Sequence, residues 1–161
     1  MPIMTNGCAQ RIRCCWGGPH NEGFKSYWPP VADDPNTTPI QREISRLDNA
    51  IEKVVISDSL TSEQTAPWYN TRIIRREDAH QQIAELKRQN GKDILVFGSR
   101  TLWNDLLSSA LVDELHLMIS PVVLGAGTPI FDGKPGVSLR LTDTHTWEGS
   151  GIALVRYEIH R

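Results

Sequence analysis

The chain has 161 residues, of which 39% are hydrophobic and 22% are charged, and its formal net charge is −2 at pH 7. This length suits one globular domain with a sizeable core, and the composition excludes a wholly disordered chain. The charge balance disfavours binding to long nucleic acids, and no run approaches the roughly 20 apolar residues that cross a bilayer.

The first 35 residues have no sustained period of two or 3.6 and are rich in Gly, Pro and Cys, so we expect irregular chain there. All three cysteines, Cys8, Cys14 and Cys15, lie in this segment. With His20 as the only nearby fourth ligand they lack the paired spacing of a zinc site, so we expect reduced thiols and no metal. The segment also lacks the pattern of a secretory signal, and we expect a cytoplasmic protein.

Regular structure is predicted from Thr38 onward. Thr38 before Pro39, with Gln41 three residues after the cap, is a capping-box pattern that marks the start of a helix. The apolar residues that follow recur every three or four positions, as on one face of a helix: Ile40, Ile44, Leu47 and Ile51.

Strands and helices then alternate along the chain. In order we predict a strand at 52–57, a strand at 70–76, a helix at 77–91, a strand at 93–97 and a helix at 101–110. A long strand at 112–124, a Gly-rich turn with a short strand at 125–131, and a hairpin of strands at 137–147 and 151–160 complete the chain. This alternation with a closing antiparallel hairpin indicates an α/β fold with a mixed sheet.

The segment Gly98–Leu102 is the strongest candidate for chemistry. Gly98 permits a sharp turn after a buried strand, and Ser99 can cap the next helix, whose free N–H groups and positive dipole end favour an anion. A diphosphate there would gain a hydroxyl from Ser99 or Thr101 and charge from Arg100. A single Gly is much weaker than a G-x-G-x-x-G motif, so these residues alone favour an ordinary strand–helix turn.

A set of linked motifs changes that assessment. A strand ending in Gly-Ser, then x-Thr-Leu, LVDEL, PVVLGAG and a Phe stand in this order from Asp93 to Phe131. Together with VVISDSL upstream and the closing hairpin, this pattern resembles the dihydrofolate-reductase-like family that includes the C-terminal reductase domain of bacterial riboflavin-biosynthesis enzymes. The resemblance covers roughly residues 53–158. It implies a three-layer α/β/α fold with a mixed, mainly parallel sheet, formed by residues 23–161 after an irregular, divergent leader at 1–22.

The resemblance also implies an NAD(P)H-dependent oxidoreductase of the dihydrofolate reductase or 5-amino-6-(5-phosphoribosylamino)uracil reductase type. Hydride would pass from NADPH to a pterin-like or aminopyrimidine-like heterocycle. Ser57 would lie near the adenosine ribose or its 2′-phosphate. The residues implied at the diphosphate and its neighbourhood are Gly98, Ser99, Arg100, Thr101 and Leu102. Asp58 stands where the family is often basic, and an acid repels a 2′-phosphate, which leaves NADH as the alternative cofactor.

By the same resemblance, Pro121, Leu124 and Gly125 would line the substrate pocket, although a turn that needs a positive φ explains Gly125 equally well. Members of the family are commonly homodimers, and we expect one here.

The front of the chain departs from the family pattern, which indicates a divergent or truncated N-terminus. Gly17, Glu22 and Phe24 keep the family register, but residues 18–21 do not, and no preceding strand or substrate-contacting acid is recognisable. No catalytic residue is therefore assigned. A catalytically impaired remnant that binds dinucleotide or dimerises is the alternative reading.

Overall fold

The computed structural model describes residues 13–91, 93–133 and 135–160. The chain divides into two compact units at Trp103 and Asn104, here called the N-terminal unit and the C-terminal unit, and each is described by itself. No helix among the described residues has the length and apolar character needed to cross a membrane.

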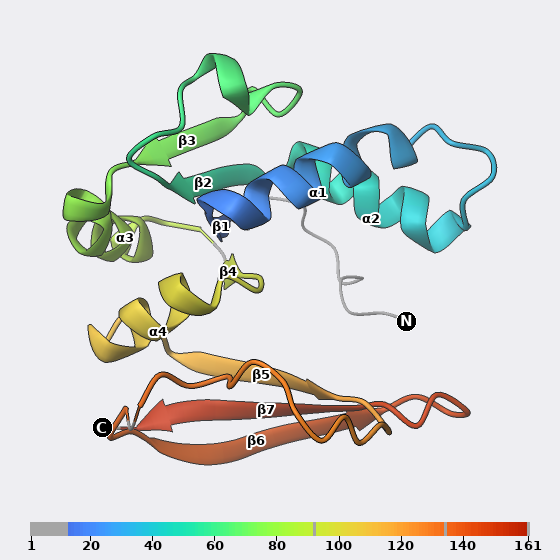
Figure 1. The fold of residues 1–161 in the computed structure, drawn as a ribbon, viewed down its shortest axis with the longest axis vertical. Coiled ribbons are helices and arrows are strands. Elements are labelled where there is room, and N and C mark those ends of the chain that lie inside the picture. Colours follow the sequence, from blue (N-terminus) through green and yellow to red (C-terminus); the bar gives the residue numbers. More distant parts are fainter. Residues whose placement is uncertain (1–12, 92, 134, 161) are drawn as a thin grey trace. The chain divides into compact units, whose positions relative to one another are not determined.

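The N-terminal unit is built on a four-stranded parallel sheet with the order β3-β2-β1-β4 (Figure 1). Its strands are β1 (Arg13–Gly17), β2 (Glu52–Ile56), β3 (Thr71–Ile74) and β4 (Ile94–Val96). The central strand β1 pairs on both sides, with Cys15 opposite Val54 in β2 and opposite Val96 in β4.

Helices connect these parallel strands. They are α1 (Gly18–Val31) and α2 (Pro39–Ala50) between β1 and β2, and α3 (Ala79–Arg88) between β3 and β4. Short 3-10 turns lie at Glu63–Thr65 and Arg76–Asp78. The β1–β2 and β3–β4 connections run in opposite directions along the sheet. Since parallel crossovers are right-handed, α1 and α2 cover one face and α3 covers the other, which gives three layers.

The core of this unit forms where the sequence is continuously apolar. Val54 and Val55 of β2 are fully buried, as expected for a parallel strand covered on both faces. Phe24, Leu60 and Leu95 pack around Val55. The predicted capping box is confirmed at the start of α2: the Thr38 hydroxyl accepts from the Gln41 N–H at 3.2 Å, and the Gln41 side chain accepts from the Thr38 N–H at 3.0 Å.

The C-terminal unit contains a three-stranded antiparallel sheet with the order β5-β7-β6. Its strands are β5 (Glu114–Ile119), β6 (Ser138–Thr146) and β7 (Ala153–His160), and β6 and β7 form the predicted hairpin. The helix α4 (Arg100–Ser108) contains the boundary between the units. It ends in a Schellman-type turn, in which Ala110 has φ 63° and the Leu111 N–H donates to the Leu106 carbonyl.

The prediction of irregular chain is wrong for residues 13–31, which form β1 and α1. A strand therefore does precede Gly17, contrary to expectation. All five residues of β1 pair with β2, and Arg13–Cys15 also pair with β4. A central strand of this kind needs no alternating pattern, because helices can cover both of its faces, and the Gly and Pro content concealed the helix. Residues 1–12 of the predicted leader, including Cys8, lie outside the described residues.

The remaining differences concern strands. The predicted long strand at 112–124 ends at Ile119, shortly before Pro121, which has no N–H to donate to a sheet. The described part of 125–131 contains no strand. The predicted α/β fold with a C-terminal hairpin is confirmed; the parallel strands lie in the N-terminal unit and the antiparallel strands in the C-terminal unit.

Candidate functional site

The carboxyl ends of the four parallel strands form one edge of the N-terminal unit. The chain proceeds from β1 outward to β2 and β3, then crosses to β4 on the other side of β1. In open α/β sheets, ligands bind outside the carboxyl ends of the strands at the point where the winding reverses. That point lies between β1, which ends at Gly17, and β4, which is followed by Gly98 and Ser99.

The turn from β4 into α4 has a backbone suited to an anion. Gly98 and Ser99 have φ values of 58° and 43°, and the Ser99 carbonyl accepts the N–H of Trp103 at 3.1 Å, so Ser99 is the residue that starts the helix. A left-handed residue followed by right-handed helix turns successive N–H groups to one side, which makes an anion-binding concavity. A positive φ at a non-glycine residue is costly and is concentrated at functional sites. The backbone of the turn is therefore suited to an anion, while Ser99 itself is only 4% exposed, so its part in binding a phosphate stays a prediction.

Ser57 occupies the corresponding position after β2. Its backbone N–H donates to the Ile74 carbonyl of β3 at 3.0 Å, and its hydroxyl oxygen accepts the N–H of Leu60 at 3.1 Å and of Ser59 at 3.4 Å. These bonds fix the turn that leaves the strand. A hydroxyl that accepts such bonds still carries its own proton for donation to a ligand.

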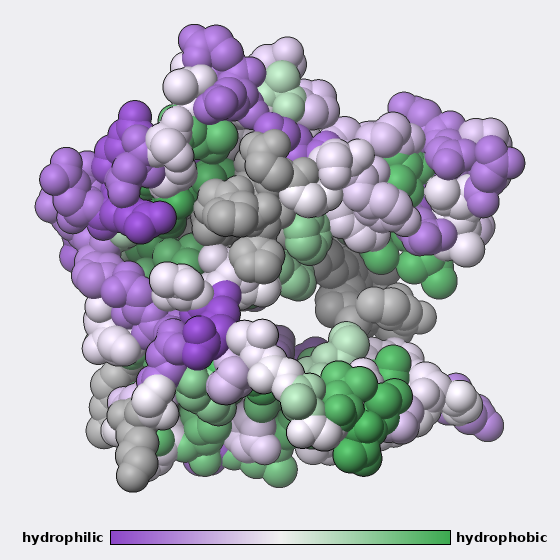
Figure 2. Space-filling view, in the orientation of Figure 1, coloured by the Kyte–Doolittle hydropathy of each residue, from purple (hydrophilic) through white to green (hydrophobic). Residues whose placement is uncertain are grey.

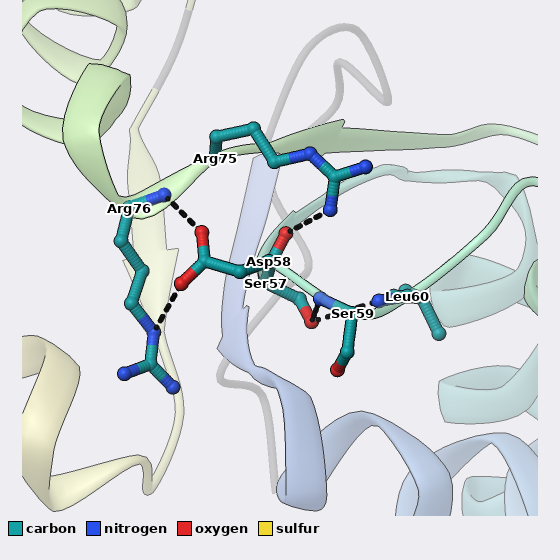
Figure 3. Close-up of polar contacts among 6 residues, drawn as sticks. All are labelled: Ser57, Asp58, Ser59, Leu60, Arg75 and Arg76. Atoms are coloured by element: carbon teal, nitrogen blue, oxygen red, sulfur yellow. Dashed lines mark hydrogen bonds and ion pairs between the residues drawn. The ribbon is translucent and has the colours of Figure 1, made fainter.

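Two arginines that follow β3 meet the residues that follow β2 (Figure 3). Arg75 Nη1 donates to the Ser57 carbonyl at 3.1 Å. One oxygen of Asp58 accepts the backbone N–H of Arg76 at 3.0 Å, and the other lies 3.3 Å from Arg76 Nε. Two guanidinium groups and the carboxylate of Asp58 thus meet at this part of the edge, and two further acids, Glu77 and Asp78, follow Arg76 in the same turn.

The sequence patterns did not identify Arg75 and Arg76 as site residues. A usable signal was present, because both arginines stand at the carboxyl end of the predicted strand 70–76, as Ser57 stands at the carboxyl end of the predicted strand 52–57. Carboxyl ends of adjacent parallel strands meet at one edge, which predicts the encounter.

The other residues expected near the diphosphate lie at the first turn of α4. Thr101 is exposed, whereas the side chain of Leu102 is only 6% exposed. The side chain of Leu102 therefore packs inside the protein. Its backbone N–H can still donate to a ligand, because the first four N–H groups of a helix have no acceptor within the helix. Arg100 is the first residue of α4.

The residues expected to line the substrate pocket belong to the C-terminal unit, so the role of Pro121, Leu124 and Gly125 stays a prediction. Gly125 has φ 73°, as the alternative of an ordinary turn also requires. Gly151 of the β6–β7 hairpin comes so close to Pro121 that a Cβ on Gly151 would lie 2.9 Å from the proline ring.

Three apolar side chains that follow β5 are 64%, 97% and 80% exposed: Val122, Val123 and Leu124. Figure 2 shows apolar surface of this kind on the C-terminal unit.

Asn104 is a positioning residue that the sequence did not indicate. Its side chain is 5% exposed; it donates to the Ile130 carbonyl at 3.0 Å and accepts the N–H of Asp132 at 2.8 Å. These two bonds fasten the end of the Gly-rich loop to α4, within the C-terminal unit.

A buried charged cluster lies at the opposite, amino end of β2. Lys53 is fully buried, and its ammonium group donates to the carbonyl oxygens of Asp48 and Ile51 and lies 4.5 Å from the centre of the Trp68 ring. Burial raises the pKa of Asp48, and the charge of Lys53 offsets part of that rise. Because this cluster is at the amino end, we assign it to the stability of the fold.

Comparison with known proteins identifies the family of this chain. The model of the RibD C-terminal domain matches residues 22–154. The uncharacterized protein YyaP of Bacillus subtilis is 32% identical over 130 residues, which are 80% of this chain and 64% of YyaP. The chain thus spans slightly less than two thirds of the length of that relative.

Solved structures share the fold. A protein of Shewanella sp. PV-4, described as a riboflavin biosynthesis protein, matches with a TM-score of 0.66 and 17% identity over 94% of this chain and 76% of its own. RibD of Acinetobacter baumannii matches with a TM-score of 0.58 and 14% identity over 92% of this chain and 47% of its own. The chain therefore belongs to the RibD C-terminal domain family, the dihydrofolate-reductase-like family of riboflavin biosynthesis that its motifs predicted.

Proposed function

We propose that this chain is a reductase domain that binds NADPH and reduces a pterin-like or aminopyrimidine-like heterocycle. The observation that carries the proposal is the edge of the parallel sheet, where the Gly98-Ser99 turn lies with Ser57 and two arginines in a member of the RibD C-terminal domain family. An anion-binding turn beside a hydroxyl and guanidinium groups suits the diphosphate and the adenosine end of a dinucleotide.

Each part of this edge has a role in the proposal. The backbone N–H groups at the start of α4, with the hydroxyls of Ser99 and Thr101, would hold the diphosphate. Ser57, Arg75 and Arg76 would hold the adenosine ribose and its 2′-phosphate. The bound cofactor supplies the hydride, and the protein supplies orientation and electrostatics.

The substrate side of the proposal rests on the C-terminal unit. Pro121, Leu124 and Gly125 would contribute to the heterocycle pocket, and the exposed apolar residues beside them suit a flat aromatic ligand. We also propose a homodimer, because Ile119 and Leu141 of the antiparallel sheet are 53% and 55% exposed. Size-exclusion chromatography with light scattering tests this, and a monomer at all concentrations contradicts it.

Titration of the reduced dinucleotides tests the function itself. We expect the fluorescence of NADPH to change on binding, and its absorbance to fall when dihydrofolate or a ribosylaminopyrimidinone phosphate is added. Binding with no oxidation by either substrate supports the alternative of a catalytically impaired remnant. If the protein binds neither NADPH nor NADH, the proposal is ruled out.

A further inference from the structure

Asp58 and the two arginines combine two opposite determinants of cofactor choice. In doubly wound dinucleotide-binding sheets with the order 3-2-1-4-5-6, an acid after the second strand hydrogen-bonds the 2′-hydroxyl of NAD, whereas a nearby arginine accommodates the 2′-phosphate of NADP. The four strands of the N-terminal unit have the 3-2-1-4 part of this order. It places Asp58 after β2 and Arg75 and Arg76 after β3, so acid and base stand at one edge.

The contacts show how the two determinants limit each other. Both oxygens of Asp58 lie against Arg76, one on the backbone N–H and one on Nε, as Figure 3 shows. The side chains are 57% and 78% exposed, so water and ligands reach both. Each carboxylate oxygen has a second lone pair, which can accept a ribose hydroxyl. The guanidinium of Arg76, in turn, is partly neutralised by the carboxylate before any phosphate arrives.

We infer, on the basis of the proposed function, that Asp58 is a specificity-determining residue that makes this chain accept NADH alongside NADPH. An unphosphorylated ribose gains a hydrogen bond to Asp58. A 2′-phosphate gains attraction from Arg75 and Arg76 but meets repulsion from Asp58, because like charges at such separations repel even in partly exposed sites. The two effects narrow the difference in affinity between the cofactors.

Binding of both cofactors to matched variants tests this inference. Asp58→Asn removes the negative charge but keeps an oxygen to accept the Arg76 N–H, so the turn is retained. Glu43→Gln is the control, since Glu43 is 58% exposed and lies 3.5 Å from the guanidinium of Arg46, an ion pair of matching exposure on α2. Dissociation constants for NADH and NADPH are measured by fluorescence titration, and melting temperatures report on folding.

We expect the wild-type affinities for the two cofactors to lie within about tenfold of each other. Asp58→Asn should tighten NADPH about tenfold and leave NADH unchanged or weaker. Arg76→Gln should weaken NADPH about tenfold and change NADH by less. Glu43→Gln should alter neither. The gain in Asp58→Asn should shrink as salt is raised from about 0.05 to 0.5 M, because ions screen exposed charges.

Other outcomes separate this inference from the proposed function. Binding of both cofactors with a ratio that Asp58→Asn leaves unchanged would overturn the inference while the proposed function stands. Equal weakening of both cofactors would assign Asp58 to positioning the strand ends, which also overturns it. Absence of binding to either cofactor would overturn both.

Discussion

Replacing Ser99 by glycine is expected to stabilise the fold and weaken dinucleotide binding. Ser99 has φ 43°, where an L-residue pays about 1–2 kcal/mol. Glycine removes that strain but has more freedom in the unfolded chain, which costs about 0.5–1 kcal/mol. Ser99→Gly should therefore raise the free energy of unfolding by about 0.5–1 kcal/mol.

The same substitution removes a hydroxyl proposed to meet the diphosphate. A hydrogen bond to a charged group contributes about 1.5–3 kcal/mol, so the dissociation constant for NADPH should rise at least about tenfold. Urea denaturation followed by tryptophan fluorescence measures the first effect, and cofactor fluorescence measures the second.

Two control variants separate strain from hydroxyl chemistry. Ser99→Ala keeps the strained backbone and removes the hydroxyl, so it should lose affinity without a gain in stability. Ala110→Gly relieves φ 63° at the end of α4 and should stabilise by a similar amount with affinity unchanged. The reasoning is refuted if Ser99→Gly destabilises the protein, or if Ser99→Ala binds NADPH as tightly as the wild type.

Further predictions concern stability and are checked by chemical denaturation. Thr38→Ala, which removes the cap of α2, should cost about 1 kcal/mol, and no loss would contradict the capping role. Lys53→Met should cost about 2–4 kcal/mol, because two carbonyls lose a charged donor inside the protein; a neutral result would show that packing alone matters there. Asn104→Ala should cost about 1–3 kcal/mol through its two lost bonds and should increase proteolysis after Ile130. Burial raises the pKa of Asp48 in the folded state, so the folded protein binds more protons than the unfolded chain, and stability falls as the pH rises between the two pKa values. Asp48→Asn should therefore stabilise above the folded pKa, with a gain that vanishes below about pH 3.9; a gain that persists in acid would contradict this.

Short sequence patterns predicted the helices and strands that form mainly through contacts between residues close together in the sequence. The capping box at Thr38 marked the start of α2, and the short β-branched stretch at 52–57 marked a buried strand, because both depend on neighbours within a few residues. The helix after Ser99 was predicted for the same reason. The predictions failed at β1, whose residues form a strand because β2 and β4 pair with it from distant parts of the chain.

The sequence by itself determined the family, the α/β class, and the glycine-serine turn as the best candidate for a phosphate. The tertiary structure alone decided the strand order, which brings the ends of β2, β3 and β4 to one edge, and the pairing of Asp58 with Arg76. It also decided the buried contacts of Lys53 and Asn104. Caps and turns are set by adjacent backbone groups, whereas these contacts join residues that only the folded sheet and its loops bring within hydrogen-bonding distance.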